Sequence, residues 1–274
     1  DGQKVETSRH TIQSRYSSKY FGTAKGVSVY TLMANHIPVN AKVIGLNEHE
    51  SHHLYDLVYN NETNVGIDLV TGDNHSINQL NFIALDVIDV GFIPSIKNVR
   101  AEADKLYSAD DPENYSGLIT PSEKIKRGLI EPQKRGILRV LLSLIMQENT
   151  QSVIIRKLSS HKRYSRLRAA LWEYNKIFKS THVLNMIDSM QLRKWVRTAR
   201  NRTEAYHQLQ NVIRRIYSGV FKGRKIADNL MCAESSRLVA NVIIAYNAIL
   251  LNNLYEKLCA KRGEDIAKKI SNYS

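Results

Sequence analysis

The spacing of apolar residues changes once along the chain, from the alternation of strands to the repeat of helices. Apolar residues recur at every second position in residues 26–35, 38–46 and 65–72, which predicts strands. From Gly136 onward they recur every three or four positions, which predicts helices almost throughout. A chain of 274 residues with this order is expected to fold as an α/β protein whose second half is mainly helical.

The strand-rich half contains its elements in a recognisable order. The runs at 26–35 and 38–46 predict an antiparallel hairpin, and Asn47 with Glu50 three positions later resembles the start of a capped helix. A strand at 65–72, a helix at 76–88 and a strand at 92–96 follow. With the segment at Asp1 as the exit of a first strand, this is the order of a ribonuclease H-like mixed-sheet core.

The second half predicts helices at 136–148, 151–158, 166–179, 189–218 and 228–262. Residues 97–135 are polar and contain three prolines. We therefore expect residues 1–96 to form the first part of the core, residues 97–188 a mostly helical insertion, and residues 189–274 helices that complete the core. The longest apolar stretch, residues 238–251, is interrupted by Asn241 and Asn247, which predicts a buried core helix and no membrane span.

Positive charge is concentrated in one part of the chain. The formal net charge is +13, and residues 151–225 contain 18 Lys and Arg against Glu173, Asp188 and Glu204. So few interspersed acids favour a polyanion partner such as nucleic acid, and the alternative is a solvated helical surface. The two cysteines, Cys232 and Cys259, are far apart in sequence and suit a reducing, cytoplasmic setting.

Three stretches combine basic residues with groups that suit DNA. Residues 9–22 interleave bases with tyrosine and phenylalanine, which favours phosphate contact and base stacking; the alternative is a β-hairpin edge that carries surface bases. Residues 156–168 contain six Lys and Arg and no acid, and a third basic ridge leads from Arg193 to Glu204. The predicted DNA contacts are Arg9, Arg15, Lys19, Arg156, Lys157, Lys162, Arg163 and Arg200.

Three acidic residues lie where a metal-dependent phosphoryl-transfer enzyme needs carboxylates. Asp1 precedes a strand-like segment, Asp73 ends the run at 65–72, and Glu204 lies in a predicted helix. Carboxylates from such elements can converge on two divalent ions about 3.5–4 Å apart, which clamp the attacking and leaving oxygens of a phosphodiester. Each residue alone has a simpler explanation: a chain terminus, a turn or helix cap, and a surface salt bridge.

Glu204 has polar neighbours on its predicted helical face. Asn201, His207 and Gln208 stand three or four positions away, which places them on the same side. His207 is therefore predicted to contact a phosphate or to orient a water molecule at the site.

A second pattern offers a different chemistry. His49-Glu50-Ser51-His52-His53 matches H-E-x-x-H, in which two histidines on one helical face bind zinc and the glutamate acts as general base. The pattern is short, no third ligand is obvious downstream, and His49 would fall in the first helical turn. A zinc hydrolase is therefore an alternative function of lower weight.

The chain as a whole resembles the catalytic region of the Tn-three family of replicative DNA transposases. The resemblance covers nearly all of it, in the segments DGQK, RHTIQSRYSSKYFG, KGVSVYTL, NEHESH, TGDNHSINQ, TQSVIIRKLSS, ALWEYN, NRTEAYHQL and ANVIIAYNAILL. It implies a ribonuclease H-like fold with a DDE triad and a helical insertion before the glutamate. The family's carboxylates fall on Asp1, Asp73 and Glu204, which the resemblance predicts to hold Mg²⁺, with Mn²⁺ as a substitute.

The resemblance also implies partners and a biological setting. It predicts cleavage at the 3′ ends of terminal inverted repeats and strand transfer into target DNA. The partners would be double-stranded DNA and, at full length, a second copy of the protein, in a bacterial cytoplasm at the nucleoid. A non-catalytic DNA-binding remnant remains an alternative.

The chain departs from the family pattern at two places. The turn at Asp73 has Gly72 directly before the aspartate, where Thr is usual, and Ser76 where Gly is common. Because the first residue is Asp and family members are far longer, we expect a fragment that is inactive, or nearly so, in isolation.

Overall fold

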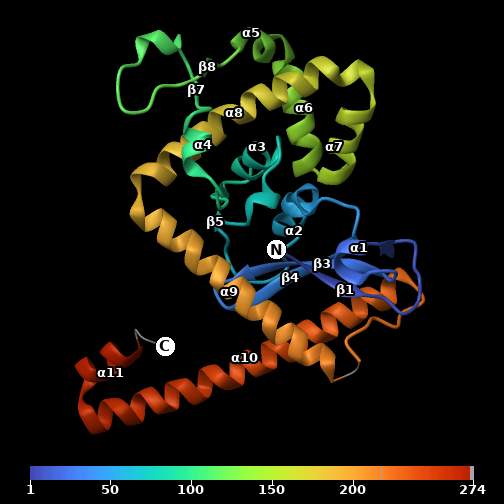
Figure 1. The fold of residues 1–274 in the computed structure, drawn as a ribbon, viewed down its shortest axis with the longest axis vertical. Coiled ribbons are helices and arrows are strands. Elements are labelled where there is room, and N and C mark those ends of the chain that lie inside the picture. Colours follow the sequence, from blue (N-terminus) through green and yellow to red (C-terminus); the bar gives the residue numbers. More distant parts are fainter. Residues whose placement is uncertain (217, 272–274) are drawn as a thin grey trace.

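A four-stranded sheet lies at the centre of the protein, and most of the helices lie to one side of it (Figure 1). The computed structural model describes residues 1–216 and 218–271. Helix α9 runs from the helical insertion down to the sheet, and α10 passes beneath the sheet and projects beyond it. The amino terminus lies between the sheet and the helices.

The sheet is built around β3 (Lys25–Ala34), which pairs antiparallel with β1 (Gly2–Glu6), β2 (Arg15–Tyr16) and β4 (Ile37–Gly45). The predicted hairpin is confirmed: β3 and β4 follow each other through a tight turn in which Asn35 has a positive φ of 56°. Asparagine tolerates this left-handed conformation better than most residues, which explains its place in the turn.

The second pair of strands is shorter than the sequence predicts. β5 (Leu69–Val70) pairs in parallel with β6 (Gly91–Phe92), whereas residues 65–68 are irregular. The predicted helix at 76–88 is likewise reduced to the short 3₁₀ turn η2 (Asn74–Ser76) and α3 (Asn81–Asp86). The side chain of Asn78 accepts from the backbone N–H groups of Leu80 and Asn81, which delays the start of α3.

The predicted helix cap at Asn47 is wrong. The chain forms the 3₁₀ turn η1 (Glu50–His53), followed by α2 (Leu54–Tyr59). The Glu50 carboxylate accepts hydrogen bonds from Lys4 and Ser28 and does not reach back to cap a helix. The Glu50 side chain therefore forms an ion pair with Lys4 of β1 in place of the expected capping hydrogen bond.

The predicted helices of the second half are confirmed, with α8 longer than expected. They are α6 (Lys134–Ile145), α7 (Gln151–Ser160), α8 (Ser165–Asp188), α9 (Met190–Arg215) and α10 (Ile226–Arg262), followed by α11 (Glu264–Ser271). Residues 97–133 contain α4 (Val99–Ala103), η3 (Pro112–Asn114), α5 (Arg127–Ile130), η4 (Glu131–Gln133) and the paired strands β7 (Tyr107–Ser108) and β8 (Glu123–Lys124). The turn η5 (Lys162–Tyr164) joins α7 to α8, and α1 (Ser18–Phe21) follows β2.

One hydrophobic cluster joins the strand half to the helical insertion. It contains Tyr30 and Ile44 from the sheet, Leu85 from α3, Leu144 from α6 and Leu171 from α8. The protein is thus of mixed α/β class, as predicted. In the described residues β5 and β6 pair with each other and not with the central sheet, so a single ribonuclease H-like mixed sheet remains an expectation.

Two buried amides fasten the insertion to the elements around Asp73. Gln151, at the start of α7, has no exposed surface and accepts a hydrogen bond from the Tyr55 N–H while donating to the side-chain oxygen of Asn81. Asn81, also fully buried, donates to the carbonyls of Ser51, at 3.0 Å, and Ser76, at 2.6 Å. Four segments of the chain therefore meet at one pair of side chains.

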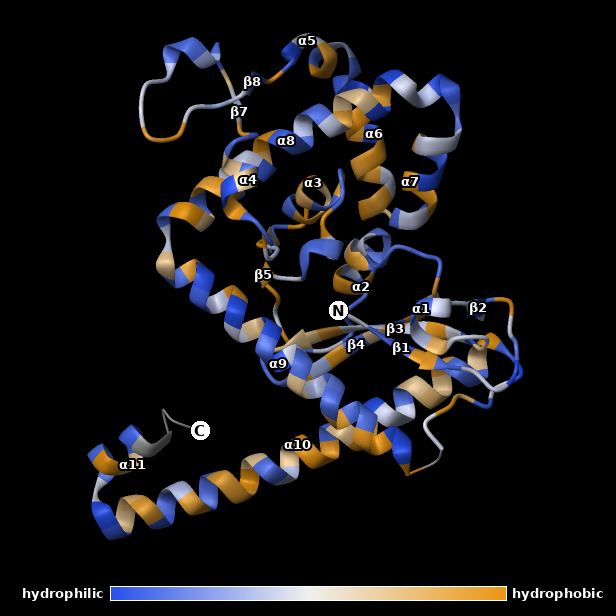
Figure 2. Ribbon diagram, viewed as in Figure 1, coloured by the Kyte–Doolittle hydropathy of each residue, from blue (hydrophilic) through white to orange (hydrophobic). Residues whose placement is uncertain are grey.

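The prediction of a buried core helix at residues 238–251 is wrong. α10 is helical there, but only its first half packs on the sheet, and Val242, Ile249 and Leu254 are 60–62% exposed. Figure 2 shows hydrophobic residues along the projecting half. Within the described residues, α10 is the one helix long and apolar enough to cross a membrane, and its most apolar window is 6% buried. A single such helix is only a weak indication of a membrane protein.

We expect Asn81→Leu to destabilise the protein by about 2–3 kcal/mol, because it leaves buried backbone carbonyls without donors. Urea denaturation followed by circular dichroism measures the change. Asn64→Leu, at an exposed loop position, is the control and should change the free energy of unfolding by less than about 0.5 kcal/mol. Equal free energies of unfolding for the two variants would contradict the proposed contribution of this amide pair to stability.

Candidate active site

Asp1 is held at the start of β1 by pairing with β3. The backbone N–H of Thr31 donates to the Asp1 carbonyl at 3.0 Å, and the Asp1 ammonium group donates to the Thr31 carbonyl at 3.2 Å. The exposed Asp1 carboxylate accepts from the Gly2 N–H at 2.7 Å. Strand pairing therefore fixes the position of this carboxylate.

Asp73 stands three residues after β5, at the start of η2. One of its carboxylate oxygens accepts from the N–H groups of His75, at 3.0 Å, and Ser76, at 3.1 Å. Capping of this kind fixes the side-chain rotamer. The simpler explanation of Asp73 as a helix cap is therefore correct for one oxygen, while the residue also lines the cleft described below.

Glu204 lies in the middle of α9 and is exposed. Its carboxylate forms no ion pair with any residue in the described part of the chain, although Arg200 and Arg202 are nearby in sequence. The salt-bridge explanation of this residue is therefore not what the structure shows.

The three carboxylates line one cleft of about 380 Å³. Ligand atoms of Asp1, Glu204 and His207 lie within 4.8 Å of one another, and Asp73 borders the same cleft. Oxygen donors with one imidazole form a donor set that suits a divalent ion. The remaining lining residues are Thr71, Gly72, Arg197, Arg200, Asn201 and Thr203.

His207 is poised as a neutral ligand. It is 8% exposed, and its Nε2 atom is buried without a hydrogen-bond partner among the described residues. Burial, with the nearby Asp1 ammonium group and Arg214, lowers the pKa of His207 to about 4. A neutral imidazole with an unused nitrogen fits a cation or a water molecule beside Asp1 and Glu204.

A partly buried ion pair close to the Asp1 amino group was not anticipated from the sequence. Lys4 stands opposite Ser28 in the β1–β3 register, and its ammonium group contacts both Ser28, at 2.9 Å, and the Glu50 carboxylate. Burial acts to raise the pKa of Glu50, but the hydrogen bond and charge of Lys4 outweigh it and hold that pKa below the ordinary value. Only the strand register brings these residues together, so no local sequence signal reveals them.

The H-E-x-x-H residues do not form a zinc site. Glu50 pairs with Lys4, and His53 Nε2 lies 2.8 Å from a carboxylate oxygen of Glu48. Because His49 precedes η1, the two outer histidines do not share a helical face. Within the described ranges, the cluster of Asp1, Glu204 and His207 is the one group with metal-ligand spacing.

The predicted DNA contacts fall on three separate surfaces. Arg9, Arg15 and Lys19 are exposed around β2 and α1, beside Tyr16, which is 59% exposed. The β2 strand pairs with β3, so the alternative of a decorated strand edge also describes this segment. Arg200 alone borders the cleft.

The second basic surface lies at the junction of α7 and α8. Arg156, Lys157, Lys162 and Arg163 are all exposed there, and the Arg163 guanidinium stacks on Tyr164 at 4.6 Å. In Figure 1 this junction lies above α1 on the side of the molecule away from α9. The surface is therefore separate from the cleft.

Comparison with known proteins identifies the family of the chain. Residues 1–273 match the Tn3 transposase DDE domain. The chain belongs to this family. It is 25% identical to the transposase for transposon Tn1546 of Enterococcus faecium, over 99% of this chain and 28% of that protein. Identity to the transposase for transposon Tn501 of Pseudomonas aeruginosa is 23%, over 94% of this chain and 26% of that protein.

Membership of this DDE family implies dependence on divalent metal ions, and the donor set of the cleft fits one. The chain spans about a quarter of the length of the curated relatives that it matches. The family and these relatives also confirm the predicted resemblance to bacterial transposases.

We expect Glu204→Gln to weaken Mn²⁺ binding at least tenfold, because a carboxylate ligand is replaced by a neutral amide. Titration of free Mn²⁺ followed by electron paramagnetic resonance measures the affinity. The control is Glu113→Gln, at an exposed position away from the cleft, which should leave Mn²⁺ affinity unchanged. Unaltered affinity in Glu204→Gln would remove this residue from the ligand set.

Proposed function

We propose that this domain catalyses metal-dependent cleavage and strand transfer of DNA at the ends of a transposon. The observation that carries the proposal is the convergence of Asp1, Asp73 and Glu204 on one cleft, from a strand, a turn and a helix. The resemblance of the surrounding segments to the DDE family predicts catalytic carboxylates at the same three positions, and the chain belongs to that family.

The carboxylates Asp1, Asp73 and Glu204 would hold two Mg²⁺ ions, for which Mn²⁺ would substitute. Such ions lower the pKa of a bound water molecule and stabilise the attacking and leaving oxygens of a phosphodiester. The side chains supply placement: pairing with β3 holds Asp1, capping of η2 orients Asp73, and α9 presents Glu204. His207 is neutral at pH 7 and would orient a water molecule or add a ligand at the same place.

The first step would free the 3′ ends of the terminal inverted repeats by hydrolysis. In the second step, each 3′-hydroxyl would attack target DNA by the same in-line displacement. In the first step water displaces the 3′-oxygen and leaves a 5′-phosphate; in the second step one phosphodiester bond of the target breaks and a new one forms. Both are in-line displacements at phosphorus, so one set of carboxylates serves both. The partners would be transposon-end and target double-stranded DNA and, for the longer protein, a second copy, in the bacterial cytoplasm at the nucleoid.

Activity of the 274-residue chain alone is expected to be low. The relatives named above are about four times as long, and DNA must be held against the cleft for chemistry to occur. Cleavage assays are therefore best made on the longest form of the protein.

A non-catalytic DNA-binding remnant is the second candidate. It is favoured only by the basic surfaces, which would bind DNA without any metal ion. The neutral, unpartnered His207 and the free Glu204 argue against it, because a remnant has no need to keep either group available.

We expect Asp73→Ala to abolish both cleavage and strand transfer while DNA affinity changes less than about twofold, because the basic residues that contact phosphates are unchanged. Gel-based cleavage in Mg²⁺ and Mn²⁺, with binding measured in Ca²⁺, tests both parts. Asp110→Ala removes an exposed carboxylate outside the cleft and serves as control. Retained cleavage in Asp73→Ala would refute the carboxylate assignment.

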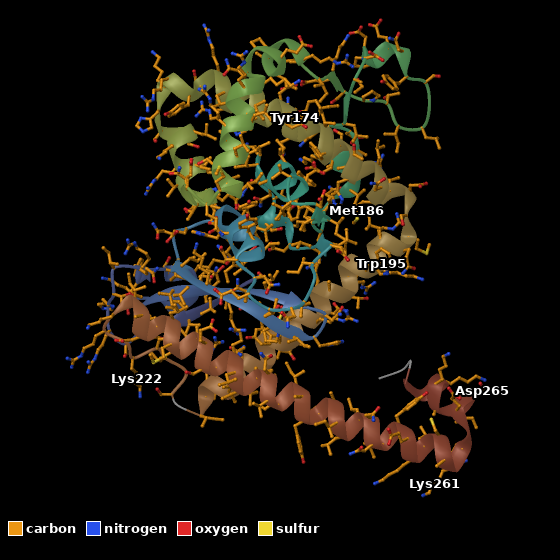
Figure 3. All side chains as sticks on the ribbon, turned by 180° about the vertical axis from the view of Figure 1, so that it is seen from behind. Tyr174, Met186, Trp195, Lys222, Lys261 and Asp265 are labelled. Atoms are coloured by element: carbon orange, nitrogen blue, oxygen red, sulfur yellow. The ribbon has the colours of Figure 1, made fainter. Side chains whose placement is uncertain are left out.

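We expect Lys157→Ala or Arg163→Ala to weaken DNA binding and to lower the slope of log affinity against log salt by about 0.9 for each lost phosphate contact. Fluorescence anisotropy at several salt concentrations measures the slope. Lys261→Ala removes the same charge at the far end of α10 (Figure 3), where we expect no contact. An unchanged slope in the first two variants would exclude the α7–α8 surface from the interface.

A further inference from the structure

The basic residues of α9 do not all have the same surroundings. Arg193 donates to the carbonyls of Met186, at 2.9 Å, and Ile187, at 2.7 Å, and so closes the carboxyl end of α8. Arg202 donates to the side chain of Asn35 at 3.2 Å and so ties α9 to the β3–β4 turn. These two guanidinium groups therefore have structural partners.

Two further arginines, Arg197 and Arg200, lie between Arg193 and Arg202 on α9 and border the cleft. Arg200 and Arg197 precede Glu204 by four and seven positions, which places all three on one side of α9. The Arg200 guanidinium donates to the hydroxyl of Ser95, three residues after β6, at 3.2 Å, and this hydrogen bond restrains its position. Arg197 is exposed and makes no hydrogen bond or ion pair with the residues that the structure describes.

Neither guanidinium neutralises a carboxylate of the cleft. In the described part of the chain, Arg197 and Arg200 form no ion pair with Asp1, Asp73 or Glu204, although all five residues line one space. The carboxylates thus stay available for cations, and the guanidinium groups stay available for anions. An arrangement of both charges around one opening suits a ligand that brings phosphate groups.

The spacing along α9 matches a nucleic-acid strand. At about 1.5 Å per residue, Arg200 and Arg197 lie about 6 and 10 Å before Glu204 along the helix axis. Each strand of a duplex carries one phosphate for about every 3.4 Å of its axis. A phosphate held near Glu204 therefore places the next phosphates of the same strand within reach of the two arginines.

We propose that Arg197 binds a backbone phosphate of the reacting strand next to the scissile phosphate, with Arg200 as its fixed neighbour. The inference rests on the proposed function, because it assumes that the cleft receives DNA. The arginines of the basic ridge thus have two roles. Arg197 and Arg200 contact the reacting strand, whereas Arg193 and Arg202 hold the helix in place. A guanidinium group suits this role because its planar donors match a phosphate oxygen pair.

The first test removes the guanidinium from the cleft. Arg197→Ala should reduce the cleavage rate about 10- to 100-fold, the usual effect of losing a hydrogen bond to a charged group, and Arg197→Lys should recover part of it. Lys194→Ala is the matched control, since it removes one charge from an exposed position of the same helix that does not line the cleft. Equal rates for Arg197→Ala and Lys194→Ala would overturn the proposal.

The second test locates the phosphate and does not need cleavage. Duplexes of the transposon end are prepared with one neutral methylphosphonate linkage at successive positions, and binding to the longest form of the protein is measured in Ca²⁺. One position beside the cleavage site should weaken wild-type binding and have no further effect on Arg197→Ala. If the loss of affinity caused by the methylphosphonate adds to the loss caused by Arg197→Ala at every position, the proposal is overturned, because the arginine then contacts none of these phosphates.

Failure of the proposed function can be distinguished from failure of the Arg197 assignment. If the wild-type protein binds Mn²⁺ and DNA but does not cleave in either metal, the proposed function fails, and the methylphosphonate scan still reports the phosphate contact. If the wild-type protein cleaves and the scan shows only additive losses, the Arg197 assignment fails while the proposed function stands.

Discussion

The pairing of Asn81 with Gln151 is the contact on which the arrangement around the cleft depends. Both amides are fully buried, so each must be hydrogen-bonded inside the protein. Their partners come from η1, α2, α3 and the turn that follows Asp73. Because the amides connect α7 to that turn, the helical insertion and the second carboxylate share one support.

The charged side chains around the cleft do not form ion pairs with one another. Three carboxylates and two guanidinium groups border one opening without pairing, while the ion pair of Lys4 and Glu50 is not part of its lining. His207 adds a neutral nitrogen. Carboxylates that gather at one opening repel one another, so their presence together is better explained by binding of a cation than by folding.

Agreement between sequence and structure depends on how local the deciding contacts are. The β3–β4 hairpin and the long helices follow from patterns within a few residues, and both were predicted. The cap expected at Asn47 failed because Glu50 pairs with Lys4, which is 46 positions away. The burial expected for residues 238–251 failed because an apolar helix pattern does not say whether a neighbouring element covers it; here Val242 is 62% exposed.

The sequence by itself determined the α/β class and the family resemblance and predicted the three candidate carboxylates, because these depend on residue identity and short-range spacing. Only the tertiary structure decided that Asp1, Glu204 and His207 meet within 4.8 Å, and that Arg197 is free while Arg193 and Arg202 are not. Such differences arise from strand register and helix packing. Both bring together groups more than 200 positions apart, such as Asp1 and His207, which no local pattern records.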